Sequence, residues 1–181
     1  LAPLFAKITT NVEPGSFNAT VTADMEDILH LEGRVQLPIQ VQVQPWLLEA
    51  PLDTGLSGET SFELQFQPLL NAFGLVQHYL DGHMKGAFTL GGGLTLPDLR
   101  GEAVMEDGHY ENAQTGTRLE HLNVTATAEG DTIRLRECTA DTDKQGSMTA
   151  TGEMRLLYTD GFPFSGTVTF KDAQFANLEY M

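Results

Sequence analysis

Five glycines in this chain each open the same short pattern. Apolar side chains stand at the second and fourth positions after the glycine, which is the period of a β-strand with one apolar face. The five segments are residues 33–37, 86–90, 101–105, 152–156 and 166–170. Two pairs of these glycines are separated by about one strand and one turn. The chain therefore reuses one unit, whose apolar face must be covered by a second sheet, a helix or a ligand.

Strand-like alternation continues along most of the chain and predicts an all-β fold. Pro38 interrupts the longest run, residues 29–43, so we expect two strands there, joined at a bulge or an edge. Turn residues such as Glu106-Asp107-Gly108 separate later strands, which predicts mainly antiparallel pairing. Strands are also expected near residues 17–25, 60–66, 83–90, 99–105, 119–128, 132–139, 147–156 and 164–170.

One segment, residues 68–80, predicts a short amphipathic helix. Pro68 suits a first helical position, and Asp81-Gly82 would end the helix. The apolar residues that would share one side are Leu69, Phe73, Val76 and Leu80.

Length and charge narrow the possible partners. The 181 residues suit one domain or two small ones, and we expect a single domain. Because the chain begins without Met, we expect it to be a piece of a longer protein. With 25 acidic and 10 basic residues, the net charge of −15 repels phosphate, so nucleic acid and attraction to charged lipid headgroups are disfavoured.

A lone cysteine, Cys138, excludes an internal disulfide framework. No stretch approaches the roughly 20 apolar residues of a membrane-spanning helix.

Candidate chemical sites in the sequence are incomplete. His78, Asp81 and His83 resemble a metal-ligand spacing without a third strong ligand nearby, and 141–146 imitates a calcium loop whose twelfth position is glycine. Arg134 and Arg136 could lower the pKa of Cys138, but no histidine is near enough to form a local dyad. We therefore expect a protein that is not an enzyme and has no cofactor, metal or catalytic residue.

An ordered set of short motifs carries a resemblance to a known family. It includes Gly92-Gly-Leu-Thr-Leu-Pro97-Asp-Leu-Arg-Gly101, Gly108-His-Tyr110, Ile133-Arg-Leu135 and Gly146-Ser-Met-Thr-Ala-Thr-Gly152. Upstream, Leu37-Pro38-Ile-Gln-Val and Leu80-Asp-Gly82 follow in the same order. The set resembles the C-terminal DUF490 region of TamB, the inner-membrane subunit of the translocation and assembly module of Gram-negative bacteria. Gly93 departs from the Thr or Ser usual in that family.

The resemblance implies a fold, a location and partners. The fold would be a curved, folded-over antiparallel sheet that forms an apolar trough, like a β-taco. The chain would lie in the periplasm, in a parent protein anchored in the inner membrane and reaching a TamA-like outer-membrane insertase barrel. Its cargo would be phospholipid acyl chains in transport between the membranes, or unfolded outer-membrane protein strands during assembly.

The alternation identifies the residues expected to line such a trough. They are the larger apolar side chains on one parity of each strand. The set is Val35, Leu37, Ile39, Val41, Val43, Phe62, Leu64, Phe66, Phe88, Leu90, Leu122, Val124, Ile133, Leu135, Met148, Met154, Leu156, Phe164, Val168 and Phe170.

A closed β-sandwich is the main alternative fold. Its two sheets would give the same alternation, and without the resemblance the sequence favours it over an open trough. Such a domain would be a binding or scaffold module for a carbohydrate or a protein partner. A carbohydrate partner is disfavoured because only Trp46 and four tyrosines are present for stacking on sugars.

Overall fold

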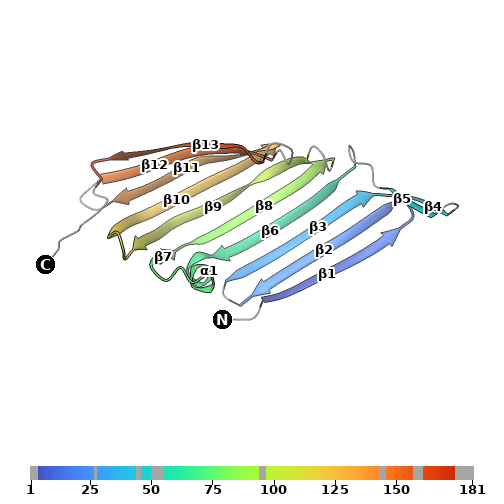
Figure 1. Cartoon of the computed structure of the whole chain (residues 1–181), viewed down its shortest axis with the longest axis horizontal. Helices are drawn as coiled ribbons and strands as arrows, with labels where there is room; N and C mark the ends of the chain where they lie inside the picture. Colours follow the sequence, from blue (N-terminus) through green and yellow to red (C-terminus); the bar gives the residue numbers. More distant parts are fainter. Residues whose placement is uncertain are drawn as a thin grey trace.

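The chain forms one wide antiparallel sheet with a small second sheet at one side (Figure 1). The computed structural model describes residues 4–26, 28–43, 46–49, 55–93, 97–142, 146–156 and 161–173. The sheet has 11 strands, ordered β1-β2-β3-β6-β8-β9-β10-β11-β12-β13, with β7 also paired to β9. The short strands β4 and β5 pair only with each other. The predicted all-β, antiparallel fold is confirmed.

The elements, in chain order, have the following bounds. They are β1 (Leu4–Glu13), β2 (Ser16–Met25), β3 (Leu29–Pro38), β4 (Gln40–Val43), β5 (Trp46–Glu49), β6 (Ser57–Gln65), α1 (Phe66–Ala72), β7 (His78–Asp81), β8 (His83–Gly92), β9 (Pro97–Asn112), β10 (Thr117–Gly130), β11 (Thr132–Thr142), β12 (Gly146–Arg155) and β13 (Phe164–Lys171).

Tight turns bring most consecutive strands side by side. Gly15 has a φ of 89° in the turn between β1 and β2, a conformation that glycine adopts without steric cost. Between β9 and β10, the side-chain oxygen of Asn112 accepts hydrogen bonds from the backbone N–H groups of Gln114 and Thr115. These bonds to a side chain satisfy backbone N–H groups that have no strand partner in the turn, and they stabilise the reversal of the chain between the two antiparallel strands.

The sheet is open and curved, and the described residues form no second layer over either of its faces. A closed sandwich is therefore not the fold of this part of the chain. Bulges interrupt the pairing of β10 with both of its neighbours. Asp107 and His121 have φ values of 53° and 50° at these irregularities. Because bulges bend strands and increase their twist, they place curvature at β9–β11.

The predicted helix over 68–80 is wrong in its bounds. The helix begins at Phe66 and ends at Ala72, and Gly74 follows with a φ of 73°, which turns the chain out of the helix. Leu80 lies in β7, opposite Tyr110 of β9. Strand pairing with β9, a contact distant in sequence, overrides the helical spacing of the apolar residues. The prediction of a break at Pro38 is confirmed, because β3 ends there and β4 belongs to the other sheet.

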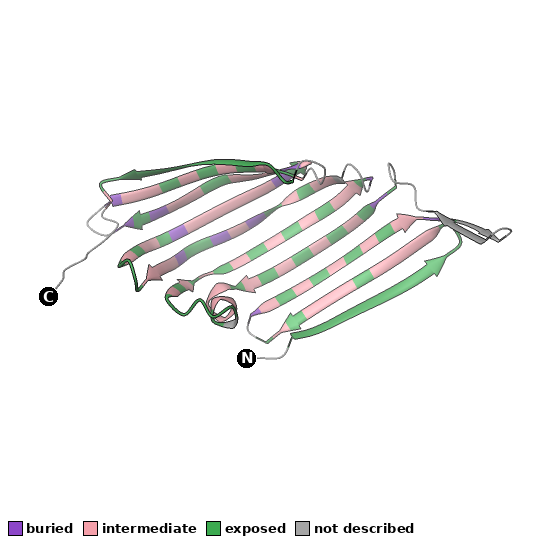
Figure 2. Ribbon diagram, viewed as in Figure 1, coloured by how far each residue is buried: buried purple, intermediate pink, exposed green. Residues whose placement is uncertain are grey.

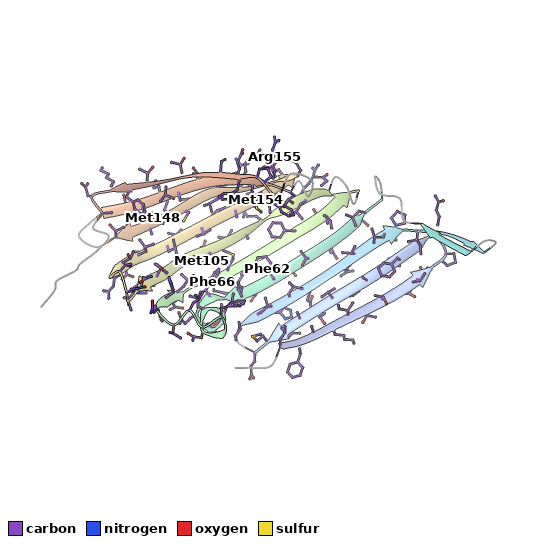
Figure 3. The ribbon with its side chains drawn as sticks, viewed as in Figure 1. Phe62, Phe66, Met105, Met148, Met154 and Arg155 are labelled. Atoms are coloured by element: carbon purple, nitrogen blue, oxygen red, sulfur yellow. The ribbon has the colours of Figure 1, made fainter. Side chains whose placement is uncertain are left out.

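Burial is deepest on β9, β10 and β11. Met105, Leu122 and Ala140 form a buried cluster, against which Phe66, Leu80 and other partly buried residues pack. Met105 and Phe66 are labelled in Figure 3. Toward β1 and β13 the side chains become exposed, as Figure 2 shows in green. The core is therefore local, and most apolar side chains of the sheet remain only half-buried.

Candidate functional site

One face of the sheet carries apolar side chains across ten successive strands. Residues directly opposite each other in neighbouring strands project to the same side of a sheet. Val21 pairs with Ile8 of β1. Met105 pairs with Met84 on one side and with Val124 on the other. We call this side of the 11-stranded sheet the apolar face, and the other side the polar face.

Most of the residues expected to line a trough lie on the apolar face. Their cross-strand pairs bring them together in rows that run perpendicular to the strands. The residues that the register places there are Val35, Leu37, Phe62, Leu64, Phe88, Leu90, Val124, Ile133, Leu135, Met148, Met154, Phe164, Val168 and Phe170.

The remaining expected residues lie outside the regular rows of paired strand residues, although two of them still contribute to the buried cluster of the apolar face. Leu122, next to a bulge, is part of the buried cluster, and Phe66 packs against that cluster from the start of α1. Ile39 is buried beyond the end of β3, where its N–H donates to the carbonyl of Gly15. Leu156 follows β12 and donates its N–H to the carbonyl of Asp131. Val41 and Val43 lie in β4, outside the 11-stranded sheet, and their side chains are outside the described part of the chain.

Several residues of the apolar face were missing from the sequence-based list. Small or flexible side chains fill its most buried part, and they include Ala103, Met105, Ala128 and Ala140. The same alternation points to them, since Ala103 and Met105 belong to the segment that Gly101 opens. Restricting the list to larger apolar residues left them out.

Two aromatic rings cover glycines near the middle of the apolar face. Phe62 and Phe88 are stacked, with ring centroids 6.3 Å apart and planes 8° from parallel. A Cβ at Gly86 would lie 2.5 Å from the Phe62 ring, and one at Gly101 would lie 2.7 Å from the Phe88 ring. The glycines therefore leave space that rings from neighbouring strands occupy.

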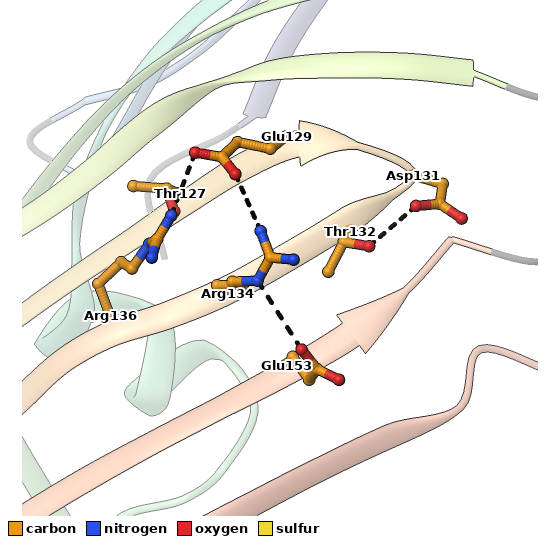
Figure 4. Close-up of polar contacts among 7 residues, drawn as sticks. All are labelled: Thr127, Glu129, Asp131, Thr132, Arg134, Arg136 and Glu153. Atoms are coloured by element: carbon orange, nitrogen blue, oxygen red, sulfur yellow. Dashed lines mark hydrogen bonds and ion pairs between the residues drawn. The ribbon is translucent and has the colours of Figure 1, made fainter.

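The polar face carries exposed ion pairs that run from strand to strand. Arg134 of β11 contacts Glu129 of β10 at 2.9 Å and Glu153 of β12 at 3.8 Å (Figure 4). Between β6 and β8, near the middle of the sheet, Lys85 contacts Glu63 at 3.2 Å and lowers the pKa of that carboxyl. Exposed pairs of this kind contribute little to the stability of a fold. Their clearest effect is to make the two faces chemically opposite.

The polar face also holds hollows between its side chains. One of about 500 Å³ is lined by residues that include Thr20, Arg34, Glu59, Thr89 and Arg100. Arg34 lies 2.7 Å from Glu59, and Arg100 lies 2.9 Å from Asp98, so each guanidinium already has a carboxylate partner. This hollow is separate from the apolar face, where a ligand would meet a broad open surface.

The histidines considered as ligands have other partners. His78 Nδ1 lies 2.9 Å from the hydroxyl of Tyr110, and His83 Nε2 lies 3.5 Å from a carboxylate oxygen of Glu63. Within the described ranges, no group of three or more His, Cys, Asp or Glu residues could hold a metal ion. Asp143 of the calcium-like segment lies outside those ranges.

The suggestion that arginines lower the pKa of Cys138 is wrong. Cys138 pairs with Val124 and Ala150, which places its side chain on the apolar face. Burial there raises the pKa of the thiol. Arg134 and Arg136 both turn to Glu129 on the polar face. A thiol on an apolar strand surface is a poor nucleophile.

Comparisons with protein-family models, curated proteins and solved structures found no match to this chain. Among the described residues, no helix has the length and apolar character needed to cross a membrane.

Proposed function

We propose that this chain is a periplasmic segment of a TamB-like envelope protein, and that its apolar face carries phospholipid acyl chains between the inner and outer membranes. The observation that carries the proposal is the apolar face itself. It extends over ten hydrogen-bonded strands, and within the described ranges no second sheet covers it, although Phe66 of α1 packs against its buried cluster. A large apolar patch without a cover is typical of an interaction surface.

Acyl chains match the chemistry of this face. They are held by removal of apolar area from water, about 25 cal/mol per Å², and they require no directional bonds. Neighbouring strands lie about 4.8 Å apart, so ten strands span roughly 40 Å. A bilayer's hydrocarbon core, which contains two layers of acyl chains, is about 30 Å thick. One acyl chain laid across the strands would therefore occupy less than half of the face.

Unfolded outer-membrane protein strands are the second candidate cargo, favoured by the two edges of the sheet. Every residue of β1 and β13 is exposed, and Phe164 of β13 is 85% exposed. An extended polypeptide needs partners for its backbone N–H and C=O groups, which a sheet edge offers and an apolar face does not. In this proposal lipid uses the face, a protein strand uses an edge, and the TamA-like barrel is reached through the full-length parent.

The proposal is tested by mass spectrometry of an organic extract of the purified chain. We expect phospholipid to co-purify with the wild type. Val21→Arg places a charge on the apolar face and should reduce the bound lipid, whereas Thr22→Arg places the same charge on the polar face of the same strand and should not. Absence of phospholipid from the wild type, or equal loss in both variants, would contradict the proposal.

A further inference from the structure

The segment that follows α1 presents apolar side chains to water. Phe73 and Val76 are 73% and 77% exposed, and Leu75 between them is 44% exposed. We call residues 73–77 the rim loop, because they lie at the margin of the sheet, in green after α1 in Figure 2. Exposed apolar residues grouped in one short loop are typical of a contact with a membrane or another protein.

Hydrogen bonds hold the rim loop in this outward arrangement. The N–H of Leu75 donates to the carbonyl of Leu70 at 3.0 Å, and the N–H of Gly74 donates to that of Asn71 at 3.1 Å. On the other side of the loop, the N–H of Ala113 donates to the carbonyl of Gln77 at 3.0 Å. The loop is therefore tied both to α1 and to the turn between β9 and β10.

The side chain of Gln67 joins α1 to β7 beneath the loop. Its oxygen accepts a hydrogen bond from the N–H of Leu80 at 2.8 Å, and its nitrogen donates to Asn71 at 3.0 Å. Leu80 and Phe66, at the two ends of this unit, pack against the buried cluster of the apolar face. The unit thus turns one set of apolar residues onto the sheet and presents another set outward.

Charge distinguishes this segment from the rest of the chain. Between Glu63 and Asp81 the sequence has no Asp, Glu, Lys or Arg, although the whole chain has 25 acidic residues among 181. An apolar tip without acidic side chains can enter a lipid interface without desolvating a carboxylate. The N–H groups of Phe73, Gly74 and Leu75 already have carbonyl partners in α1, which suits a medium that offers no hydrogen bonds.

We propose that the rim loop inserts into the surface of a bilayer of neutral, zwitterionic phospholipid and seats the margin of the apolar face against it. The role of the insertion rests on the proposed function, since its purpose would be to let acyl chains pass between the bilayer and the sheet. Insertion relies on the side chains of Phe73, Leu75 and Val76, so it needs no attraction to charged headgroups. A protein partner on the same loop is the competing possibility.

Flotation of the 181-residue chain with phosphatidylcholine vesicles tests the insertion. We expect the wild type to float with the vesicles. The double variant Phe73→Ser, Val76→Ser should bind the vesicles at least roughly tenfold more weakly, since two large apolar groups are removed from the interface. A matched control replaces two exposed apolar residues that are not on the apolar face, Phe5→Ser on the polar face of β1 and Phe162→Ser before β13, and should float like the wild type. Addition of phosphatidylglycerol at low salt should weaken wild-type flotation, because the chain carries a net charge of −15.

The outcomes separate this inference from the proposed function. If the rim-loop variant floats as well as the wild type, or the wild type does not float, insertion of the loop is wrong and a protein partner is favoured for it. The co-purified phospholipid of the variant is then measured. If the variant no longer floats but still contains co-purified lipid, the rim loop inserts into the bilayer and is not needed to hold lipid on the apolar face. If flotation depends on the loop but neither protein contains co-purified lipid, insertion is supported and the lipid-carrying face is contradicted.

Discussion

Phe62 and Phe88 stack across two neighbouring strands, with ring centroids 6.3 Å apart and planes 8° from parallel. Each ring also lies over a glycine of the next strand, Phe62 over Gly86 and Phe88 over Gly101. The repeated glycine pattern in the sequence thus has a packing role here. Gly86 and Gly101 open room for a ring, and the ring replaces the side chain that the glycine lacks.

Gly101→Ala should destabilise the chain. A Cβ at this position would lie 2.1 Å from the carbonyl oxygen of Ala87 and 2.7 Å from Cα of Phe88, and backbone atoms cannot move aside as a flexible side chain can. Overpacking of this kind typically costs about 1–3 kcal/mol. Gly91→Ala is the matched control, since its nearest contact would be an ordinary 3.8 Å. Urea unfolding of both variants measures the difference, and equal midpoints would mean that the close approach at Gly101 is not tight.

Arginine at two positions of the apolar face should have unequal costs. Val168 is 56% exposed on the edge strand β13, so Val168→Arg keeps its charge in water and should leave the melting temperature nearly unchanged. Val124 is half-buried and packs against the Met105 cluster, so Val124→Arg should be the more destabilising but still fold, because the face has an open side. Thermal melts of both variants measure this. Complete unfolding of both would indicate a sealed core.

Both variants should also impair the parent protein if the face carries lipid. A guanidinium on the apolar face stands among the positions proposed for acyl chains. We expect cells whose full-length parent carries Val168→Arg to become sensitive to detergent although the domain melts normally. Full resistance together with a normal melt would remove this position from the proposed path.

Stability should depend on pH near neutrality through His109. Burial lowers its pKa, but hydrogen bonds to Glu120, at 2.6 Å, and to Glu111 outweigh burial and raise the pKa overall. A histidine whose pKa is raised by folding stabilises the fold fully below its unfolded pKa of about 6.5, and this contribution is lost as the pH rises through the folded pKa. His109→Gln should therefore flatten the fall in melting temperature above about pH 6.5.

The acid side of the same profile provides a control. Lys85 lowers the pKa of Glu63, so the contribution of Glu63 is present above its unfolded pKa of about 4.3 and is lost as the pH falls through the folded value. Glu63→Gln should flatten that acid limb and leave the neutral limb intact. If Glu63→Gln changed the melting temperature only above about pH 6.5 and His109→Gln changed it only in acid, the assignment of both groups would be contradicted.

The sequence predicted the strands, because a strand alternates with a period of two residues. It predicted less of the features that depend on which distant strands pair with each other. Residues 29–38 alternate strictly, and β3 follows them with one parity on the apolar face. Leu80, by contrast, fits a helical spacing but pairs with Tyr110 of β9, a partner that no local pattern indicates. His121, with a φ of 50°, marks a bulge set by the pairing of β10 with β9.

The alternation of apolar and polar residues also could not predict whether the apolar face is open or covered by a second layer. Alternation at Leu64 or Val168 is the same in an open sheet and in a sandwich, because it reports only that one side of the strand is apolar. The number of layers depends on where all the strands go. The structure resolves this point for the described residues, in which the ten-strand path never folds into a second sheet.

Photo-crosslinking at neighbouring residues of β6 shows whether the apolar face holds acyl chains. Leu64 projects to the apolar face, where it pairs with Leu29 and Met84, and Gln65 projects to the other side. With a photoreactive amino acid placed at each position in cells, we expect phospholipid adducts at Leu64 and none at Gln65. Equal capture at both positions, or capture at Gln65 alone, would contradict the proposed role of the apolar face.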